Sequence, residues 1–225
     1  MVAAVLAGLS LLTALGATGM PVRASAEDSP PMIQSQKPIK LVAFGDSLTA
    51  GYGLQLTSAF PARLEKALRE KGYNVDVHNA GVSGDTVADG LARLDWSIPE
   101  GTEAAIVELG ANDALRGLDP KNTRAGLDEI VKRLRQRNIS VMLAGMYAPR
   151  NYGADYAGDF DRIYPDLAKA YGLTLYPFFL DGVVTDPKLN QGDGLHPTAA
   201  GVDVIVARIL PTVEAFLTKL TAASR

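Results

Sequence analysis

From Ile39 onward, short apolar segments alternate along the chain with longer segments in which apolar and polar residues mix. The short segments have the length and composition of β-strands. We predict strands at Ile39–Phe44, Val75–Asn79, Ala104–Leu109, Ser140–Met146 and Leu173–Pro177.

The longer segments predict helices. Pro61–Gly72 has a proline in its first turn and a glycine at its end, and Pro120–Arg137 follows Asp119, a residue type that caps helices. Further helices are predicted at Thr86–Asp95, Ala157–Tyr171 and Thr198–Leu217. Strands that alternate with helices predict right-handed crossovers and helices on both faces of a sheet. We therefore expect a three-layer α/β/α sandwich of the flavodoxin-like type, with a mostly parallel five-stranded sheet in one domain over residues 39–220.

In an open parallel sheet, ligands bind outside the carboxyl ends of the strands. Glycine-rich loops with polar side chains occur at these predicted positions. They are Gly45–Gly51 after the first strand, Ala80–Thr86 after the second, Leu109–Gly117 after the third, and Gln191–Pro197 before the last helix. We expect the chemistry of the protein to lie in these loops.

The loop after the first strand places Asp46 and Ser47 at the end of an apolar segment. Such a loop either cradles a phosphate or presents a nucleophile. Neither GxGxxG nor GxxxxGK[ST] follows Phe44, which disfavours nucleotide binding. A serine nucleophile needs a general base, most often a histidine that a carboxylate orients.

The sequence has only two histidines. His196 follows Asp193 by three residues in a loop shaped by glycines and Pro197, so one tight turn can supply both the base and its carboxylate. His78 lies in a predicted strand, and we interpret it as structural. Asp46, Asp193 and His196 could instead bind a metal ion, but a single histidine with no second one nearby is a weak zinc site.

A serine that attacks an ester carbonyl would also require hydrogen-bond donors for the oxyanion of the tetrahedral intermediate. The candidates are the backbone N–H groups of Ser47 and Gly84 and the side-chain amide of Asn112. A glycine at position 84 lets the chain approach a substrate without a Cβ in the way. The alternative for Asn112 is a turn residue that caps its own loop.

Four sequence blocks in order resemble the GDSL or SGNH hydrolase family: GDSL at Gly45–Leu48, the loop around Gly84, GAND at Gly110–Asp113, and DGLHP at Asp193–Pro197. Longer segments such as Val107–Gly117 are similar to the branch of arylesterases and of the periplasmic enzymes called thioesterase I, protease I and lysophospholipase L1. The resemblance implies Ser47 as nucleophile, His196 as base, Asp193 as its orienting carboxylate, and Ser47, Gly84 and Asn112 as the oxyanion hole, with no cofactor and no metal ion.

The resemblance also implies small ester or lipid-like acyl substrates, including thioesters. The groove for the acyl chain would be lined by Ala114, Leu115, Arg116, Gly117 and Leu118, together with the segment Met146–Tyr152, in which Tyr147 and Pro149 are candidate contacts. The alternative for this second segment is an ordinary surface loop. A non-catalytic ester- or carbohydrate-binding module is the alternative function, although such a module has no need of a complete catalytic set.

Composition narrows the possible partners. With 225 residues of which 47% are hydrophobic, the chain can form one sizeable core. The net charge of −3 gives no positive field for nucleic acid, which we exclude as a partner. The absence of cysteine excludes disulfides and thiolate metal sites.

The amino-terminal segment resembles a secretory signal peptide. Val2–Met20 is apolar and uncharged, and Ala24-Ser25-Ala26 has the small residues that signal peptidases accept. Cleavage after Ala26 would leave a disordered lead-in at residues 27–38 and a secreted or periplasmic protein without stable membrane insertion. An uncleaved membrane anchor is the alternative, because the apolar segment is close to the ~20 residues that span a bilayer.

Overall fold

The computed structural model of the chain describes residues 37–223. The predicted signal peptide, residues 1–26, and nearly all of the predicted lead-in lie outside the described residues. Within the described part, no helix is long and apolar enough to cross a membrane.

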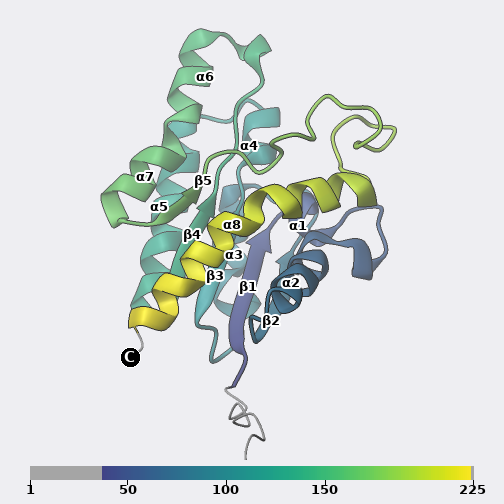
Figure 1. Cartoon of the computed structure of the whole chain (residues 1–225). Coiled ribbons are helices and arrows are strands. Elements are labelled where there is room, and N and C mark those ends of the chain that lie inside the picture. Colours follow the sequence, from purple (N-terminus) through teal and green to yellow (C-terminus); the bar gives the residue numbers. More distant parts are fainter. Residues whose placement is uncertain (1–36, 224–225) are drawn as a thin grey trace, which may run out of the picture. The chain divides into compact units, whose positions relative to one another are not determined.

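A five-stranded sheet forms the centre of the fold, with the strand order β2-β1-β3-β4-β5 (Figure 1). Every neighbouring pair is parallel. This order is that of a doubly wound sheet, in which the chain reverses its direction of growth after β2 and adds β3 on the other side of β1. The strands are β1 (Ile39–Gly45), β2 (Val75–Gly81), β3 (Ala104–Glu108), β4 (Ser140–Ala144) and β5 (Thr174–Tyr176).

Helices cover both faces of the sheet, so the predicted three-layer α/β/α architecture is confirmed. On one face α2 (Phe60–Glu70) packs against α8 (Ala199–Ala223). On the other face α5 (Pro120–Gln136) packs against α3 (Val87–Ser97) and α7 (Ile163–Tyr171) (Figure 1).

The prediction of a single helix over Ala157–Tyr171 is wrong in detail, because two helices occupy this part of the chain. The first, α6, spans Ala154–Asp161, and α7 starts at Ile163. The cause is Pro165, which has no N–H to donate to the carbonyl of Asp161 and whose ring would clash with that carbonyl in a continuous helix.

Very short helices begin where β1 and β3 end, in segments that the sequence predicts as loops. They are α1 (Ser47–Ala50) and α4 (Ala111–Leu115). Two single 3₁₀ turns, η1 (Leu56–Ser58) and η2 (Arg150–Tyr152), complete the described elements. Both α1 and α4 therefore carry candidate site residues at the carboxyl end of the sheet.

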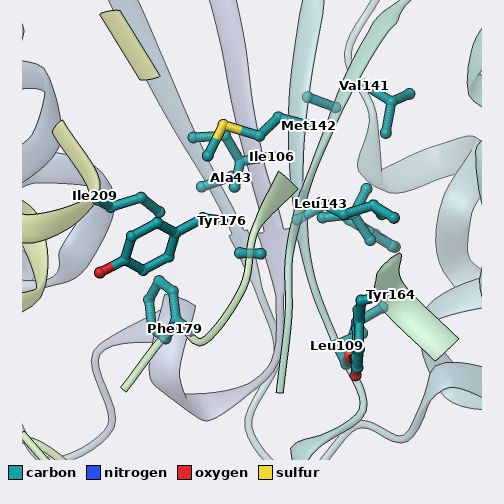
Figure 2. Packing of buried hydrophobic residues seen from close by; sticks show 14 of the residues in the cluster. Ala43, Ile106, Leu109, Val141, Met142, Leu143, Tyr164, Tyr176, Phe179 and Ile209 are labelled. Carbon is teal, nitrogen blue, oxygen red and sulfur yellow. Dashed lines mark hydrogen bonds between the residues drawn. The ribbon is translucent and has the colours of Figure 1, made fainter. Parts of the chain in front are cut away.

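The hydrophobic core lies on both faces of the sheet. In β4, Val141 and Leu143 point to the face covered by Tyr164, whereas Met142 points to the opposite face, toward Ile209 of α8 (Figure 2). These side chains are all buried. The inner strands β3 and β4 are covered on both faces, which explains why the sequence shows them as almost continuous apolar segments.

Candidate active site

The first site element is the turn from β1 into α1. Asp46 lies between them, is fully buried, and accepts a hydrogen bond at Oδ1 from the N–H of Leu48 (3.0 Å). Ser47 is the first residue of α1, so both its N–H and its hydroxyl lie at the carboxyl end of β1. This capped turn fixes Ser47 at the sheet edge where ligands bind.

Ser47, His196 and Asp193 form one continuous hydrogen-bonded chain. His196 Nε2 lies 3.0 Å from Ser47 Oγ, and His196 Nδ1 lies 2.6 Å from Asp193 Oδ2. The N–H groups of His196 and Leu195 also donate to Asp193 Oδ1, at 3.0 and 2.9 Å. The backbone and ring of His196, with the Leu195 N–H, hold the pKa of Asp193 well below its usual range, so this carboxylate stays charged.

The loop that carries His196 is tied to the loop that carries Ser47. The Gln191 amide donates to the carbonyl of Tyr52 (2.7 Å) and to that of Pro197 (2.9 Å). The Tyr52 ring lies 4.6 Å from the His196 ring, centroid to centroid. Sequence reasoning missed both Tyr52 and Gln191, because backbone acceptors and ring contacts leave no motif.

The three predicted oxyanion donors are brought to the same edge of the sheet by β1, by the loop after β2 and by α4. Among the described residues, neither the N–H of Ser47 nor that of Gly84 has a hydrogen-bond acceptor. Gly84 has a φ of +87°, in the region that glycine adopts without strain. The N–H groups at both positions are thus available to a ligand.

Asn112 links the Ser47 turn to the loop that carries Gly84. Its Nδ2 donates to Asp46 Oδ2 (3.2 Å) and to the carbonyl of Asp85 (3.0 Å). Both amide hydrogens therefore have acceptors here, and donation to a substrate oxygen would replace or share one of these bonds. The bridge sets the spacing between the Ser47 turn and the Gly84 loop.

A pair of buried carboxyl groups, Asp46 and Glu108, lies beneath the Ser47 turn. Burial raises the pKa of Asp46 to about 7, against the opposing effects of the Leu48 N–H, His196 and Asn112. Burial and the neighbouring charge of Asp46 raise the pKa of Glu108 well above its usual range. The Glu108 carboxyl accepts a hydrogen bond from the Thr49 hydroxyl (2.7 Å). Sequence reasoning missed Glu108, whose one visible signal is a charge at the end of an apolar strand.

A mostly apolar cavity of about 650 Å³ opens beside Ser47, Asn112 and His196. Of the predicted substrate contacts, Ala114, Leu115, Tyr147 and Pro149 line it. Arg116, Gly117 and Leu118 are not part of its lining; the Arg116 guanidinium instead donates to the carbonyl of Gly84 (2.9 Å). Sequence reasoning missed other residues of the lining, which include Phe178, Leu180, Val184, Thr185 and Asn190.

The second histidine is placed elsewhere. His78 lies within β2, opposite Val42 in the strand register, and does not line the cavity. Over residues 37–223, the His, Asp and Glu side chains form no group of three or more that could hold a metal ion.

Comparison with known proteins agrees with this geometry. Residues 43–204 match the GDSL-like lipase/acylhydrolase family. The chain is 41% identical over 164 residues to an arylesterase of Vibrio mimicus, covering 72% of this chain and 82% of that protein. It is 40% identical over 158 residues to thioesterase 1/protease 1/lysophospholipase L1 of Escherichia coli K12, covering 70% and 74%.

Among solved structures, AlinE4, an SGNH-hydrolase family esterase, is 49% identical, with a TM-score of 0.68 over 80% of this chain and 97% of that one. The family expected from the four sequence blocks is thereby confirmed, together with its branch and its fold. The chain belongs to the GDSL-like lipase/acylhydrolase family.

Proposed function

We propose that this protein hydrolyses carboxylic esters of acyl or aryl groups, and the corresponding thioesters, through an acyl-enzyme at Ser47. The observation that carries the proposal is the hydrogen-bonded chain from Asp193 through His196 to Ser47, which ends at an apolar cavity. A serine becomes a nucleophile when a histidine accepts its proton and a carboxylate orients that histidine, and His196 and Asp193 lie in this order beside Ser47.

In the first half of the reaction, Ser47 Oγ attacks the carbonyl carbon while its proton moves to His196 Nε2, 3.0 Å away. Asp193 accepts the hydrogen bond from Nδ1 and stabilises the imidazolium that forms. The imidazolium then protonates the leaving alcohol or thiol. In the second half, His196 takes a proton from water as the water oxygen attacks the acyl carbon, and it then returns the proton to Ser47 Oγ as the bond to Ser47 breaks and the acid leaves.

The oxyanion of each tetrahedral intermediate is bound by the N–H groups of Ser47 and Gly84, which lack acceptors among the described residues. Asn112 is the third donor, and its amide turns partly away from Asp46 or Asp85 as charge appears on the substrate oxygen. Such donors, fixed before the reaction, are often the largest contribution to catalysis.

The cavity supports small and medium-sized apolar acyl or aryl groups. Its volume of about 650 Å³ lies within the range of sites for small ligands. Tyr147 stacks on Phe178 with ring centroids 4.7 Å apart, which provides a flat aromatic wall. The names of the relatives, arylesterase and thioesterase 1/protease 1/lysophospholipase L1, agree with such a site.

We further propose that the enzyme acts outside the cytoplasm, after cleavage of a signal peptide following Ala26. The support is the apolar segment Val2–Met20 and the sequence Ala24-Ser25-Ala26. Amino-terminal sequencing of the protein recovered from the periplasm of a Gram-negative host should begin at Glu27. An intact Met1 in the membrane fraction would refute cleavage.

The catalytic proposal is tested with Ser47→Ala and His196→Ala, using p-nitrophenyl esters of increasing chain length, a lysophospholipid and an acyl-CoA. Each variant should lose about 10⁴-fold or more in kcat, by analogy with other serine hydrolases. The control is His78→Ala, which removes the other histidine and should keep full activity. Turnover by Ser47→Ala near that of the wild type would refute the proposal, and binding without turnover in the wild type would favour a non-catalytic module.

A further inference from the structure

Arg93, on α3, is a buried cation next to the proposed oxyanion hole. It is only 6% exposed, and its guanidinium lies over the Phe44 ring, 4.4 Å from the centroid. A buried arginine needs hydrogen-bond acceptors for its N–H groups, because an unpaired charge in the interior is very unfavourable. The identity of these acceptors indicates what the side chain does.

The guanidinium of Arg93 joins three separate segments of the chain. Its Nη2 donates to the carbonyl of Gly45 at the end of β1 (2.8 Å). Its Nη1 donates to the carbonyl of Ala80 near the end of β2 (2.9 Å) and to the hydroxyl of Ser97 (3.1 Å). Its Nε donates to the Asp85 carboxylate (2.5 Å). The same planar group therefore holds the nucleophile strand, the neighbouring strand and the loop after it.

Two of these contacts lie next to the proposed oxyanion donors. Gly45 precedes Ser47 by two residues, and Asp85 directly follows Gly84. The carbonyl of Asp85 also accepts the hydrogen bond from Asn112 (3.0 Å). Each of the three donors is therefore close to a residue that Arg93 contacts. Ser47 and Gly84 lie within two residues of Gly45 and Asp85 along the chain, and Asn112 is linked to Asp85 by one hydrogen bond.

We propose that Arg93 is a positioning residue, which fixes the separation of the Ser47 and Gly84 N–H groups through Gly45 and Asp85. The inference rests on the proposed function, since it concerns the oxyanion of that reaction. Lysine could keep the charge but not the planar fork, so it could not reach the carboxylate and both carbonyls at once.

The expected effect is on the chemical step. Oxyanion donors act only when they lie about 2.7 to 3.1 Å from the developing charge, and a misplacement of about 1 Å can cost on the order of 100-fold in rate. Binding of the ground-state ester depends mainly on the apolar cavity, whose lining does not include Arg93. Loss of the fork should therefore lower kcat and leave KM nearly unchanged.

The experiment compares Arg93→Lys with the matched control Arg137→Lys. Arg137 also donates from its guanidinium to a backbone carbonyl, that of Ile98 (2.8 Å), in the segment that precedes β3. We measure kcat and KM with p-nitrophenyl butyrate, Tm, and the folded fraction by circular dichroism. Arg93→Lys should lose about 10- to 100-fold in kcat per folded molecule, with KM within about threefold. Arg137→Lys should keep its kcat.

An unchanged kcat per folded molecule in Arg93→Lys, with only a lower Tm, would overturn the inference, because that is the result of a purely structural role. If Arg93→Lys does not fold, Asp85→Asn decides in its place: it keeps the shape of the acceptor and weakens the contact. A lower kcat at steady KM supports the inference, and an unchanged kcat overturns it. Ser47→Ala is measured alongside, since activity in that variant would refute the proposed function itself and would overturn the inference together with it.

Discussion

The buried carboxyl group of Asp46 makes the stability of the fold depend on pH in an unusual direction. Its pKa is raised by burial from an ordinary value of 3.8 to about 7. Between these values the folded protein binds a proton that the unfolded chain has already released. By linkage, the free energy of unfolding must fall as pH rises from about 4 through 7.

The size of the effect follows from the same shift. The pKa of Asp46 differs by about 3 units between the unfolded and folded chain, and each unit corresponds to about 1.36 kcal/mol. Relative to pH values below 4, the free energy of unfolding should therefore be lower by about 4 kcal/mol once the pH is well above 7. Full burial of the side chain means that solvent screens little of this cost. A typical domain has a stability of only about 5 to 15 kcal/mol, so the change is large.

The assay is urea unfolding at pH values from 4 to 9, for the wild type and for Asp46→Asn. Far-ultraviolet circular dichroism is the better signal, because the only tryptophan, Trp96, is 76% exposed and will change little in fluorescence. The asparagine cannot titrate, so the stability of the variant relative to the wild type should rise with pH by up to about 4 kcal/mol. Part of this rise comes through Glu108, whose own raised pKa depends on the charge of Asp46. A constant difference between the two proteins from pH 4 to 8 would refute the reasoning.

Further substitutions separate catalysis, packing and substrate size. Asn112→Ala should lower kcat by about 10² to 10³ with little change in KM if Asn112 donates to the oxyanion, whereas a destabilised variant with full kcat would limit it to bridging the loops. Tyr164→Phe removes a buried hydrogen bond to the carbonyl of Leu109 (2.8 Å), so chemical denaturation should show a loss of about 1 to 3 kcal/mol with kcat unchanged. Val184→Trp narrows the cavity, and assays over the ester series should show a greater loss of kcat/KM for long acyl chains than for acetate; an equal loss would contradict the placement of the acyl group there.

Much of the fold is predictable because the inner strands β3 and β4 are covered on both faces and are therefore almost continuously apolar. All five predicted strands are present, with ends that differ by a few residues from those predicted. The helix starts at α2 and α5 were marked by proline and by the Asp119 cap. The break at Arg162 was missed because a helical pattern of apolar residues continues across it, although Pro165 was visible. Local steric effects at a proline can outweigh such a pattern.

The site is predictable to the extent that side-chain identity reveals the chemistry. A serine at a strand end and one histidine close to an aspartate leave few alternatives, and the structure brings Ser47, His196 and Asp193 into contact. The parts that were missed act through backbone carbonyls or through burial. In sequence Arg93 looks like any arginine on an amphipathic helix, and its role depends on acceptors 13 and 48 residues away along the chain. No periodicity or motif predicts such contacts.

Several buried groups that cost free energy lie at the end of the sheet where the chemistry of the protein is proposed. The buried carboxyl groups of Asp46 and Glu108 and the buried ion pair of Arg93 with Asp85 all lie around the Ser47 turn and the loop that follows β2. Each costs free energy of desolvation, which packed apolar side chains in their place would not. The strands below them supply the compensating burial, with Leu41, Val42 and Phe44 of β1 almost completely inaccessible. Apolar burial in the middle of the sheet stabilises the fold, whereas the proposed site lies at the carboxyl end of the sheet. A substitution that stabilises the core can therefore leave kcat unchanged. One that removes a single member of the Arg93–Asp85 pair leaves the other charge buried and unpaired, so it should lose stability and rate together.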